Sequence, residues 1–367
     1  MMNIADSQIY RGSNRTMRVV ELTAPGILAE NFEPIPEPQL DEVLLRTQAI
    51  SVCSTDVSYF HGYLHPDHYP VILGHEYVGE VVAVGPDADP DLMGKRLSYF
   101  GQTDFKGMAE YRVLRPLFAG ETKSSTFETS RDFKDDHYAA AVVIPDDVDR
   151  TAAPLLEPIT AVLRAILKHP PKVGDNALVL GGGPCGAIAG TILKKVFATR
   201  TVGLLERNAD RAAMAQSHYA DVVYRDAEAL GSGRDPGLRF DYIFDALPPI
   251  VGGAEDADPR RAAFKSATPE ATYILYGASM EMQKFDTWLL LAKGINVKAG
   301  AFDVDYYPMS YTASVLRSAL NLLQSKIIDP EWIMSRHIRF EDFDALAWTF
   351  QNHEKNPDLK TVITFDA

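Results

Sequence analysis

A glycine-rich turn between two buried segments constrains the fold of this chain more than any other feature. The apolar stretch 176–180 is typical of a buried strand, and it runs into the sequence GGGPCG at 181–186, where a helix begins. A second apolar strand, 201–205, ends in Glu206, twenty residues after the last of these glycines. Glycines in this setting allow a tight turn and the close approach of a pyrophosphate to the helix N-terminus. We therefore expect a dinucleotide site, rather than a plain turn, in an α/β domain.

The residues expected to bind the cofactor lie in this turn and at the ends of the strands beside it. They are Gly181, Gly183, Pro184, Cys185, Gly186, Glu206, Arg207, Arg211 and Gly277. The carboxylate of Glu206 would accept hydrogen bonds from both ribose hydroxyls and repel a 2′-phosphate, which favours NAD. Arg207 and Arg211 leave NADP open, because a guanidinium binds such a phosphate with two hydrogen bonds, although both can also be solvated at a helix start. Gly277 lies at the mouth of the fifth strand, where a bound nicotinamide needs a close backbone.

The order of strands and helices predicts two domains. From residue 158 onward, apolar strands alternate with helices, which predicts a doubly wound parallel sheet of the Rossmann type over 158–300. Its six strands are expected at 177–180, 201–205, 221–223, 240–245, 271–276 and 295–299. The preceding part, 1–157, is mainly β, with short strands expected at 18–22, 41–47, 78–84 and 108–114.

A second group of residues has the chemistry of a metal site. Cys53, His75, Glu76 and Glu157 are of the types that hold zinc while leaving one position open for substrate. His75 and Glu76 belong to a GHE sequence that starts at Gly74, and the histidine follows Cys53 by twenty-two residues. Alone, GHE also fits a turn glycine before a half-buried histidine and a surface glutamate. The surrounding sequences CSTD, YPVILGHEYVGEVV and LLEP favour the metal site.

These motifs, in this order and spacing, resemble the zinc-dependent branch of the medium-chain dehydrogenase/reductase family, the alcohol, polyol and sugar dehydrogenases. The likeness extends from about residue 17 to residue 363, with further matches in GMAEY at 107–111 and KTVI at 360–363. It implies a GroES-like catalytic domain at 1–157 that is completed by 301–367. It also implies a nicotinamide cofactor, one catalytic zinc per subunit, and a homodimer or homotetramer.

The resemblance assigns roles around the zinc. It implies that Cys53 and His75 hold the metal, with Glu76 or Glu157 completing the shell. Asp56 would orient the imidazole of His75. Thr55 would accept the alcohol proton and hand it to the cofactor ribose or to water, although it can also be a β-branched residue that packs in a turn. Ser58 stands where many relatives have a histidine that passes the proton to solvent. It can take part through water but cannot act as the base.

Length, charge and cysteine content further restrict the number of domains, the kinds of metal site, the location and the partners that we expect. A chain of 367 residues with 46% hydrophobic content exceeds what one core usually serves. Two cysteines exclude both a disulfide framework and the four-cysteine structural zinc lobe of many relatives. A thiolate ligand suits a reducing compartment, and neither a membrane span nor an apolar signal core is present in the sequence, so we expect a cytoplasmic protein. The net charge of −14 disfavours nucleic acid and anionic membranes as partners.

The leading functional hypothesis is zinc-dependent oxidation of a secondary alcohol by a nicotinamide cofactor. Glu157-Pro158 resembles the polyol and sugar enzymes more than the simple alcohol enzymes, so a polyol, sugar or cyclitol is expected. The alternatives are a metal-independent enone or quinone reductase of the same fold and a non-catalytic dinucleotide-binding protein. The complete ligand set argues against both. The substrate pocket is expected to be lined by Tyr59, Phe60, Tyr99 and Phe302.

One polar stretch, 118–137, has neither a strand nor a helix period. A connection of this length in a compact domain is usually functional or disordered. Its composition fits a solvated surface insertion, and it also fits a lid or a subunit contact.

Overall fold

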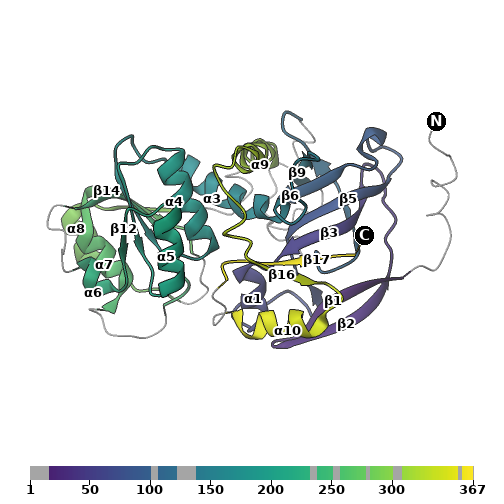
Figure 1. Ribbon diagram of the computed structural model, residues 1–367, viewed down its shortest axis with the longest axis horizontal. Helices are drawn as coiled ribbons and strands as arrows, with labels where there is room; N and C mark the ends of the chain where they lie inside the picture. The colour runs from purple at the N-terminus through teal and green to yellow at the C-terminus, as the bar shows by residue number, and fades with distance from the viewer. Residues whose placement is uncertain are drawn as a thin grey trace.

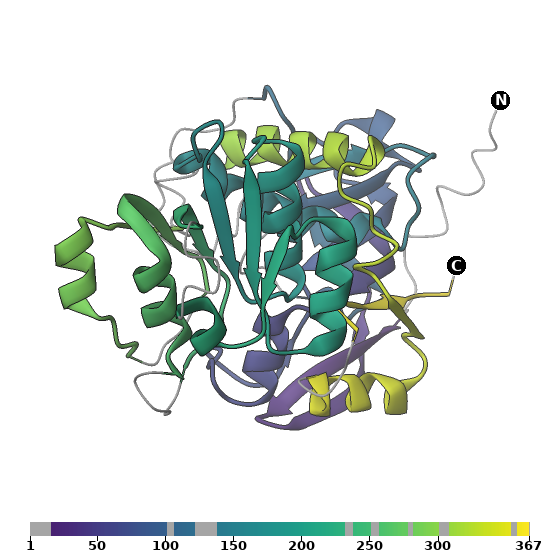
Figure 2. The same cartoon turned by 60° about the vertical axis from the view of Figure 1, so that its left-hand side comes forward.

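The computed structural model describes residues 16–100, 106–121, 138–231, 238–250, 257–277, 282–300, 308–353 and 358–366. Figure 1 shows two lobes, one with helices on both faces of a parallel sheet and one built mainly from antiparallel strands. Figure 2 brings the first lobe forward, so that the strands of its sheet are seen side by side. The predicted fold class, a doubly wound α/β sheet beside a mainly β domain, is confirmed.

Six parallel strands form the first sheet, in the order β12-β11-β10-β13-β14-β15. They are β10 (Asn176–Leu180), β11 (Thr201–Leu205), β12 (Val222–Tyr224), β13 (Phe240–Asp245), β14 (Ala267–Leu275) and β15 (Asn296–Ala299). The helices between them are α4 (Pro184–Lys195), α5 (Ala209–His218), α6 (Ala227–Gly231), α7 (Pro259–Ser266) and α8 (Thr287–Lys293). The strand order reverses at β10, so the crevice at the carboxyl ends of β10 and β13 is where ligands of such sheets bind.

The apolar run of β10 reflects burial on both faces of the sheet. Val179 packs into the core on the side of α4, whereas Leu178 and Leu180 pack into the core on the side of α6 and α7. Successive side chains of a strand point to opposite faces. A strand covered on both sides must therefore be apolar at every position, which is why 176–180 shows no alternation.

The mainly β lobe contains an eight-stranded sheet and a three-stranded sheet. The larger sheet has the order β16-β17-β3-β5-β6-β9-β8, with β7 also paired to β3, and the smaller sheet has the order β2-β1-β4. The larger sheet comprises β3 (Val43–Ser51), β5 (Glu76–Val84), β6 (Arg96–Phe100), β7 (Tyr111–Leu114), β8 (Pro116–Leu117), β9 (Ala139–Ile144), β16 (Arg336–Arg339) and β17 (Thr361–Thr364). The smaller one comprises β1 (Thr16–Ala24), β2 (Ile27–Pro34) and β4 (Val71–Ile72). Because β17 pairs with β3, the tail returns to the first part of the chain as the resemblance implied.

Two helices join the lobes. Helix α3 (Leu156–Lys168) leads into the parallel sheet, and α9 (Met309–Gln324) follows it. Arg164 of α3 donates a hydrogen bond to Thr312 of α9 over 3.1 Å. One continuous core contains apolar residues of both helices and of both lobes. The exact domain boundaries, after residue 157 and after residue 300, stay predictions.

Two further helices of the mainly β lobe, α1 (Ser54–Phe60) and α10 (Phe343–Gln351), lie next to each other and pack through Phe60 and Phe350, whose ring centroids are 5.5 Å apart (Figure 1). In the part of the chain that the structure describes, no helix is both long enough and apolar enough to cross a membrane. Most of the polar stretch 118–137, namely 122–137, and the expected pocket residue Phe302 lie outside the described residues.

Candidate metal and dinucleotide site

The pairing of β3 with β5 brings the candidate metal ligands together. Ser51, at the end of β3, lies opposite Glu76, at the start of β5. Cys53 follows two residues after Ser51 and caps the N-terminus of α1. Gly74 turns the chain into β5 with φ +92°, a conformation that side chains rarely adopt, and a Cβ there would press on the backbone of residues 107 and 108. This register places His75 and Glu76 beside Cys53.

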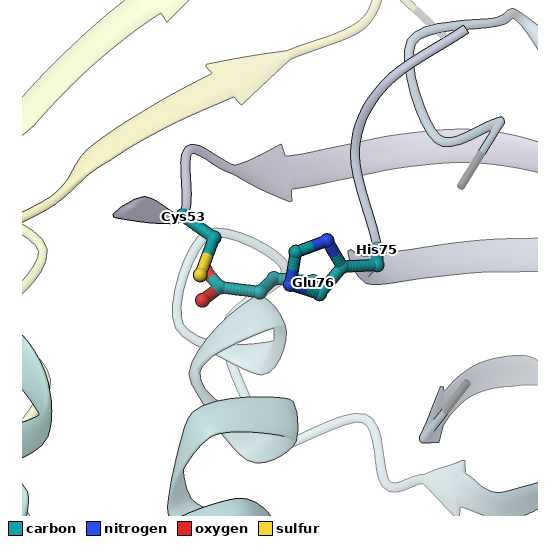
Figure 3. A group of neighbouring side chains, drawn as sticks. All are labelled: Cys53, His75 and Glu76. Atoms are coloured by element: carbon teal, nitrogen blue, oxygen red, sulfur yellow. The ribbon is translucent and has the colours of Figure 1, made fainter. Parts of the chain in front are cut away.

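Cys53, His75 and Glu76 form a compact donor cluster (Figure 3). One ligand atom from each residue lies within 4.8 Å of the others. His75 and Glu76 are only 4% and 0% exposed, so the surface-glutamate reading of GHE is wrong. Sulfur, imidazole nitrogen and carboxylate oxygen are the donors that zinc takes in proteins. The residues therefore fit a zinc ion, and their assignment as its ligands stays a prediction.

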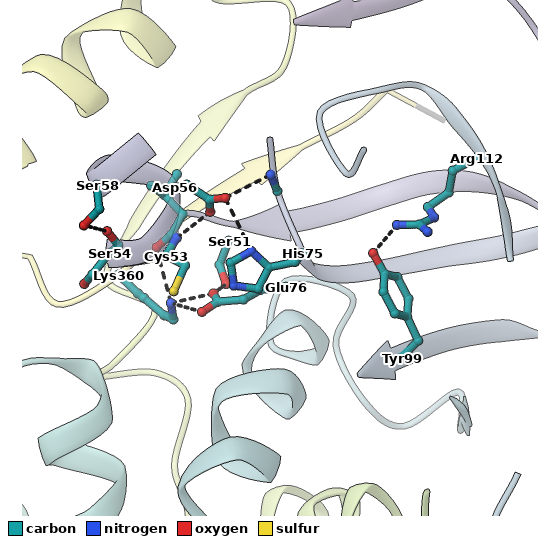
Figure 4. A network of polar contacts seen from close by, with 12 residues as sticks. Ser51, Cys53, Ser54, Asp56, Ser58, His75, Glu76, Tyr99, Arg112 and Lys360 are labelled. Carbon is teal, nitrogen blue, oxygen red and sulfur yellow. Dashed lines mark hydrogen bonds and ion pairs between the residues drawn. The ribbon is translucent and has the colours of Figure 1, made fainter. Parts of the chain in front are cut away.

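Asp56 ties the cluster to its scaffold. Its fully buried carboxylate accepts hydrogen bonds from the N–H groups of Cys53, at 3.0 Å, and of Gly74, at 3.1 Å. It also lies 3.4 Å from Nδ1 of His75, the contact predicted from the sequence (Figure 4). Burial favours the neutral acid, but the charge of His75 and these hydrogen bonds outweigh it and hold the pKa of Asp56 below its usual value. The carboxylate thus stays charged and orients the imidazole.

Glu76 carries a second set of contacts that the sequence analysis missed. Lys360, directly before the last strand, lies 2.5 Å from the carboxylate of Glu76, and Ser51 donates a short hydrogen bond to that carboxylate. The ammonium is buried and also donates to the carbonyl of Val52 at 3.3 Å. The one signal in the sequence is a lysine directly before the apolar segment TVIT, where a buried strand begins.

Glu157 lies on the first turn of α3 and is 5% exposed. Burial raises the pKa of its carboxyl group to about 7, and the charge of Glu76 acts in the same direction. The charges of His75, Lys360 and Arg164 lower that pKa. These influences place Glu157 beside the cluster, although it does not belong to the three residues whose donor atoms lie within 4.8 Å.

The expected proton-relay residues occupy α1. Thr55 and Ser58 are both half-buried, and the hydroxyl of Ser58 donates to the carbonyl of Ser54 at 2.9 Å. Their catalytic roles stay predictions. Tyr59 is also half-buried, and the pKa of its phenol, raised by burial, responds to the charges of His75 and Asp56.

Two of the expected pocket residues were assigned wrongly. Phe60 and Tyr99 are 3% and 0% exposed and lie in the core of the mainly β lobe. Tyr99 packs against Tyr77 and accepts a short hydrogen bond from Arg112 (Figure 4). An aromatic side chain can serve a core and a pocket equally well, so sequence alone did not separate the two.

The glycine turn has the geometry of a phosphate-binding loop. Gly181 adopts φ +90°, and a Cβ on Gly186 would collide with the carbonyl oxygen of Gly181. Gly183 caps α4, and Pro184 begins it, a position where proline needs no N–H partner. The free N–H groups at the start of this helix favour an anion. The assignment of these residues to the cofactor stays a prediction.

Glu206 is fixed at the carboxyl end of β11. Its carboxylate accepts hydrogen bonds from the N–H groups of Gly182, at 2.7 Å, and of Asn208, at 2.6 Å. It is 7% exposed, whereas Arg207 is exposed and Arg211 is half-buried. Arg225 donates to the carbonyls of Glu206 and Arg207, and so holds this strand end in place.

The dinucleotide turn lies next to the metal cluster. Cys185 accepts a hydrogen bond from the hydroxyl of Tyr276, with 3.8 Å between oxygen and sulfur. Burial raises the pKa of the Cys185 thiol to about 12, and the charges of Cys53 and Glu76 raise it too. Cys185 is therefore within electrostatic range of Cys53. Gly277 follows Tyr276, and a Cβ there would collide with the carbonyl of Leu247, so only a bare backbone fits at this strand end.

Comparisons with known proteins agree with this geometry. The family model of the alcohol dehydrogenase GroES-like domain matches residues 39–116. Human sorbitol dehydrogenase is 30% identical to the chain over 353 residues, which cover 93% of the chain and 94% of that protein. The starvation-sensing protein RspB of Escherichia coli is 23% identical over 358 residues, or 95% of the chain and 99% of that protein.

Solved structures share the fold. An Escherichia coli alcohol dehydrogenase complexed with NADH aligns with a TM-score of 0.75 and 21% identity over 95% of the chain and 99% of that chain. A zinc-binding dehydrogenase of Sinorhizobium meliloti bound to NADP aligns with a TM-score of 0.74 and 21% identity over the same shares. The family itself follows from the human relative, which matches at 30% identity over nearly the whole length. The chain belongs to the zinc-dependent alcohol, polyol and sugar dehydrogenase branch of the medium-chain dehydrogenase/reductase family.

Proposed function

We propose that this protein is a zinc-dependent dehydrogenase that transfers a hydride between a secondary alcohol of the polyol, sugar or cyclitol type and NAD. One observation carries the proposal. The charge of Cys53 in the buried donor cluster acts on the thiol of Cys185 at the start of α4, which supports a metal cluster and a glycine turn that lie near each other. Hydride transfer needs the two reacting carbons in near contact. A substrate at the cluster and a nicotinamide at the turn would satisfy that need.

Different residues of the chain would bind the metal and transfer the proton. Cys53 and His75, with Glu76 or Glu157, would hold Zn²⁺, which when bound supplies a Lewis acid that makes a substrate hydroxyl more acidic. We assign to Thr55, two residues after Cys53, the role of accepting the alcohol proton. Ser58 donates its own proton to the backbone, so its oxygen still accepts a hydrogen bond from a water on the way to solvent.

A hydroxyl-rich substrate fits the surroundings of the cluster. Burial raises the pKa of the Tyr59 phenol, and the charges of His75, Asp56 and Tyr69 also act on that pKa. The hydroxyl of Tyr69 is buried and has no hydrogen-bond partner among the residues that the structure describes. A buried hydroxyl without a partner is costly, and a hydroxyl of the substrate would satisfy it. The human sorbitol dehydrogenase relative supports the same substrate class.

The preference for NAD rests on Glu206. Its carboxylate is held by two backbone N–H groups at the end of β11, where the adenosine ribose of a bound dinucleotide would lie. A fixed negative charge there repels a 2′-phosphate. Because Arg207 is exposed, it remains the residue through which NADP would be accepted.

The test is a screen of polyols, sugars and cyclitols for NADH formation by the purified protein, together with metal analysis. We expect one zinc per chain and turnover of at least one polyhydroxy alcohol. Cys53→Ser serves as the control, because it removes one metal ligand and leaves the glycine turn intact. Two tightly held zinc ions per chain, or none after a metal-replete preparation, would contradict the proposal. A metal-independent reductase or a non-catalytic protein would not need the buried thiol–imidazole–carboxylate cluster, which disfavours both.

We further propose that the protein is a homo-oligomer that pairs through the outer edge of the parallel sheet. All four residues of the edge strand β15 are exposed, and α8, which precedes β15 in the chain, buries none of its residues. Trp288 and Leu291 of α8 are 73% and 77% exposed, and Val297 of β15 is 39% exposed. An exposed edge strand with apolar neighbours invites pairing, and two identical strands related by a two-fold axis pair antiparallel.

The oligomer is tested by measuring the mass in solution with light scattering. Leu291→Glu should shift the protein toward the monomer, because it introduces a charge at the centre of this face. Phe32→Glu is the matched control, since Phe32 is 66% exposed on β2 in the other lobe. A wild-type protein that is monomeric at high concentration, or an effect of Phe32→Glu equal to that of Leu291→Glu, would contradict the assignment.

We place the protein in the cytoplasm with a small molecule as its partner. Cys53 and Cys185 are both free, and a thiolate ligand is best preserved in a reducing compartment. The net charge of −14 supports neither nucleic acid nor an anionic membrane as a partner. Fractionation of the source cells would test the location.

A further inference from the structure

A buried ion pair lies at the carboxyl end of β13, in the dinucleotide lobe. Asp245 is the last residue of that strand, and Arg260 lies in the first turn of α7. Their side chains are 0% and 2% exposed, and Nε of Arg260 donates to Oδ2 of Asp245 at 2.7 Å. Taking two charges out of water costs about as much as their attraction returns, so a buried ion pair is weak evidence for a role in stability alone.

Asp245 fixes the segments that follow two neighbouring strands. Its Oδ1 accepts a hydrogen bond from the N–H of Leu247 at 3.0 Å, after β13. Its backbone carbonyl accepts from the N–H groups of Tyr276, at 3.0 Å, and of Gly277, at 2.8 Å, after β14. Its Oδ2 also accepts from the hydroxyl of Tyr273 at 2.6 Å. One residue thus holds the segments 246–250 and 276–277 in a single arrangement.

Arg260 extends this arrangement beyond the two strand ends. Its Nη1 donates to Oε1 of Gln283 at 2.8 Å, and the same oxygen accepts from the N–H of Ile250 at 2.9 Å. Burial lowers the pKa of Arg260, but the charge of Asp245 and the hydrogen bond between them outweigh it and raise that pKa. The guanidinium therefore stays charged and keeps both contacts.

The two segments lie on the side of the sheet that is left for the nicotinamide. The glycine turn follows β10 and Glu206 ends β11, whereas β13 and β14 lie on the other side of β10 in the strand order. A dinucleotide whose adenosine ribose is at β11 therefore extends its other end over β13 and β14. The segments also border the glycine turn, because a Cβ on Gly181 would lie 3.3 Å from the side chain of Leu247, and Tyr276 donates to Cys185.

We propose that Asp245, together with Arg260 and Tyr273, positions the segments 246–250 and 276–277 against the nicotinamide end of the cofactor. The inference rests on the proposed function, since it takes the dinucleotide site as given. Asp245 is a positioning residue, because it acts through the backbone that it holds. Without its charge the two segments relax in the free protein, and binding of the nicotinamide has to restore their arrangement. The adenosine end meets β10 and β11 and does not carry that cost.

The probes are NADH and ADP-ribose, which has the same adenosine and phosphates but no nicotinamide. Both are titrated by calorimetry into the full-length wild-type protein and into Asp245→Asn. Asparagine keeps the shape but replaces one oxygen by an NH₂ group, so at least one buried donor loses its acceptor. We expect the Kd of NADH to rise by about tenfold or more, whereas the Kd of ADP-ribose stays within about twofold of wild type.

The matched control is Asp241→Asn, near the amino end of the same strand. The carboxylate of Asp241 accepts from the N–H of Asn176 at 2.9 Å and from the hydroxyl of Thr268 at 3.0 Å. It joins the same three strands at the opposite edge of the sheet, so neither Kd should change.

A second variant, Tyr273→Phe, keeps the ion pair and removes one hydrogen bond from Asp245. It should raise the Kd of NADH by about 2–10-fold and leave that of ADP-ribose unchanged. If Asp245→Asn does not fold, as judged by circular dichroism, Tyr273→Phe decides the question by the ratio of the two Kd values.

An NADH Kd in folded Asp245→Asn equal to that of wild type overturns the inference. So does an equal loss of affinity for NADH and ADP-ribose, which would make the pair a structural element of the lobe alone. An equal effect of Asp241→Asn on NADH binding overturns it as well. The proposed function fails in a different way, because wild type would then bind neither NADH nor ADP-ribose in stoichiometric amount, and the inference would fall with it.

Discussion

Replacing Asp56 by asparagine should weaken zinc binding more than it weakens the fold. The aspartate and asparagine side chains have nearly the same shape, so the substitution changes hydrogen bonding and charge without opening a cavity. The carboxylate of Asp56 faces three nitrogen atoms, those of Cys53 at 3.0 Å, Gly74 at 3.1 Å and His75 at 3.4 Å. Asparagine offers a single oxygen, and its NH₂ group would turn a second donor toward a backbone N–H.

The size of the effect follows from these contacts. At least one buried N–H loses its acceptor, which costs about 1–3 kcal/mol of folding free energy. The imidazole of His75 loses the carboxylate that orients it, and loss of such an outer partner typically lowers metal affinity by about 10–100-fold. That range corresponds to about 1.4–2.7 kcal/mol of binding free energy.

The assay is competition for zinc between the protein and a chromophoric chelator, at neutral pH and with the fold checked by circular dichroism. Asp342→Asn is the matched control, because Asp342 caps α10 by accepting from the N–H of Ala345 at 2.9 Å, far along the chain from the metal ligands. A folded Asp56→Asn protein with the zinc Kd of wild type would refute the reasoning, since His75 would then be oriented by something other than Asp56.

Three further outcomes are expected. Cys53→Ser should abolish zinc binding and turnover. The NADH Kd, measured by fluorescence, should stay close to that of wild type, because Cys53 belongs to the other lobe. A large loss of NADH affinity would disprove the separation of the metal site from the NADH site. Glu206→Ala should shift the preference between NAD and NADP, measured as the ratio of their kcat/KM values, toward NADP by about 1–3 kcal/mol. The reason is that the repelling carboxylate is gone and Arg207 is free to bind the phosphate. A wild type that already prefers NADP would show that the arginine dominates. Burial lowers the pKa of His353 to about 4, and the charges of Lys360 and Arg211 act in the same direction. The folded histidine stays neutral while the unfolded one gains a proton below about pH 6.5, so stability is complete above that pH and falls by about 2–3 kcal/mol as the pH approaches 4. Urea unfolding should show that His353→Gln flattens this dependence; an equal loss in the variant would assign it to another group.

The sequence predicted the elements that have a strong local pattern. The apolar strands expected at 177–180 and 201–205 lie within the strands observed, and the glycine turn that begins at 181 leads into a helix as expected. Each of these depends on neighbouring residues alone. The short strand β16 and the helix α10 were missed, because their composition is mixed and their pairing partners lie far away in the chain.

The clustering of three candidate site residues was predicted from the sequence, but the electrostatics of the site were not. Cys53, His75 and Glu76 lie in recognisable motifs, and the structure brings them together. The contact between Glu76 and Lys360 joins residues that are 284 positions apart, and no periodicity reports such a pair. The burial of Tyr99 was missed for a related reason, since the face of a strand that meets the core depends on the register of its neighbours.

The position of Lys360 also has a consequence for the order of assembly. Bringing it to Glu76 from a disordered chain would require closing a loop of 284 residues, which costs about 5 kcal/mol in chain entropy on the logarithmic scale for flexible loops. About half of that loop, residues 169–308, lies between α3 and α9 and contains the parallel sheet. Arg164 and Thr312 hold these two helices together, so the folded sheet behaves as a short connector between them. Folding of the dinucleotide lobe therefore shortens the loop that must close for the ammonium to reach its carboxylate. A destabilised Rossmann sheet should deplete the protein of metal during synthesis, even when every residue that touches the metal is intact.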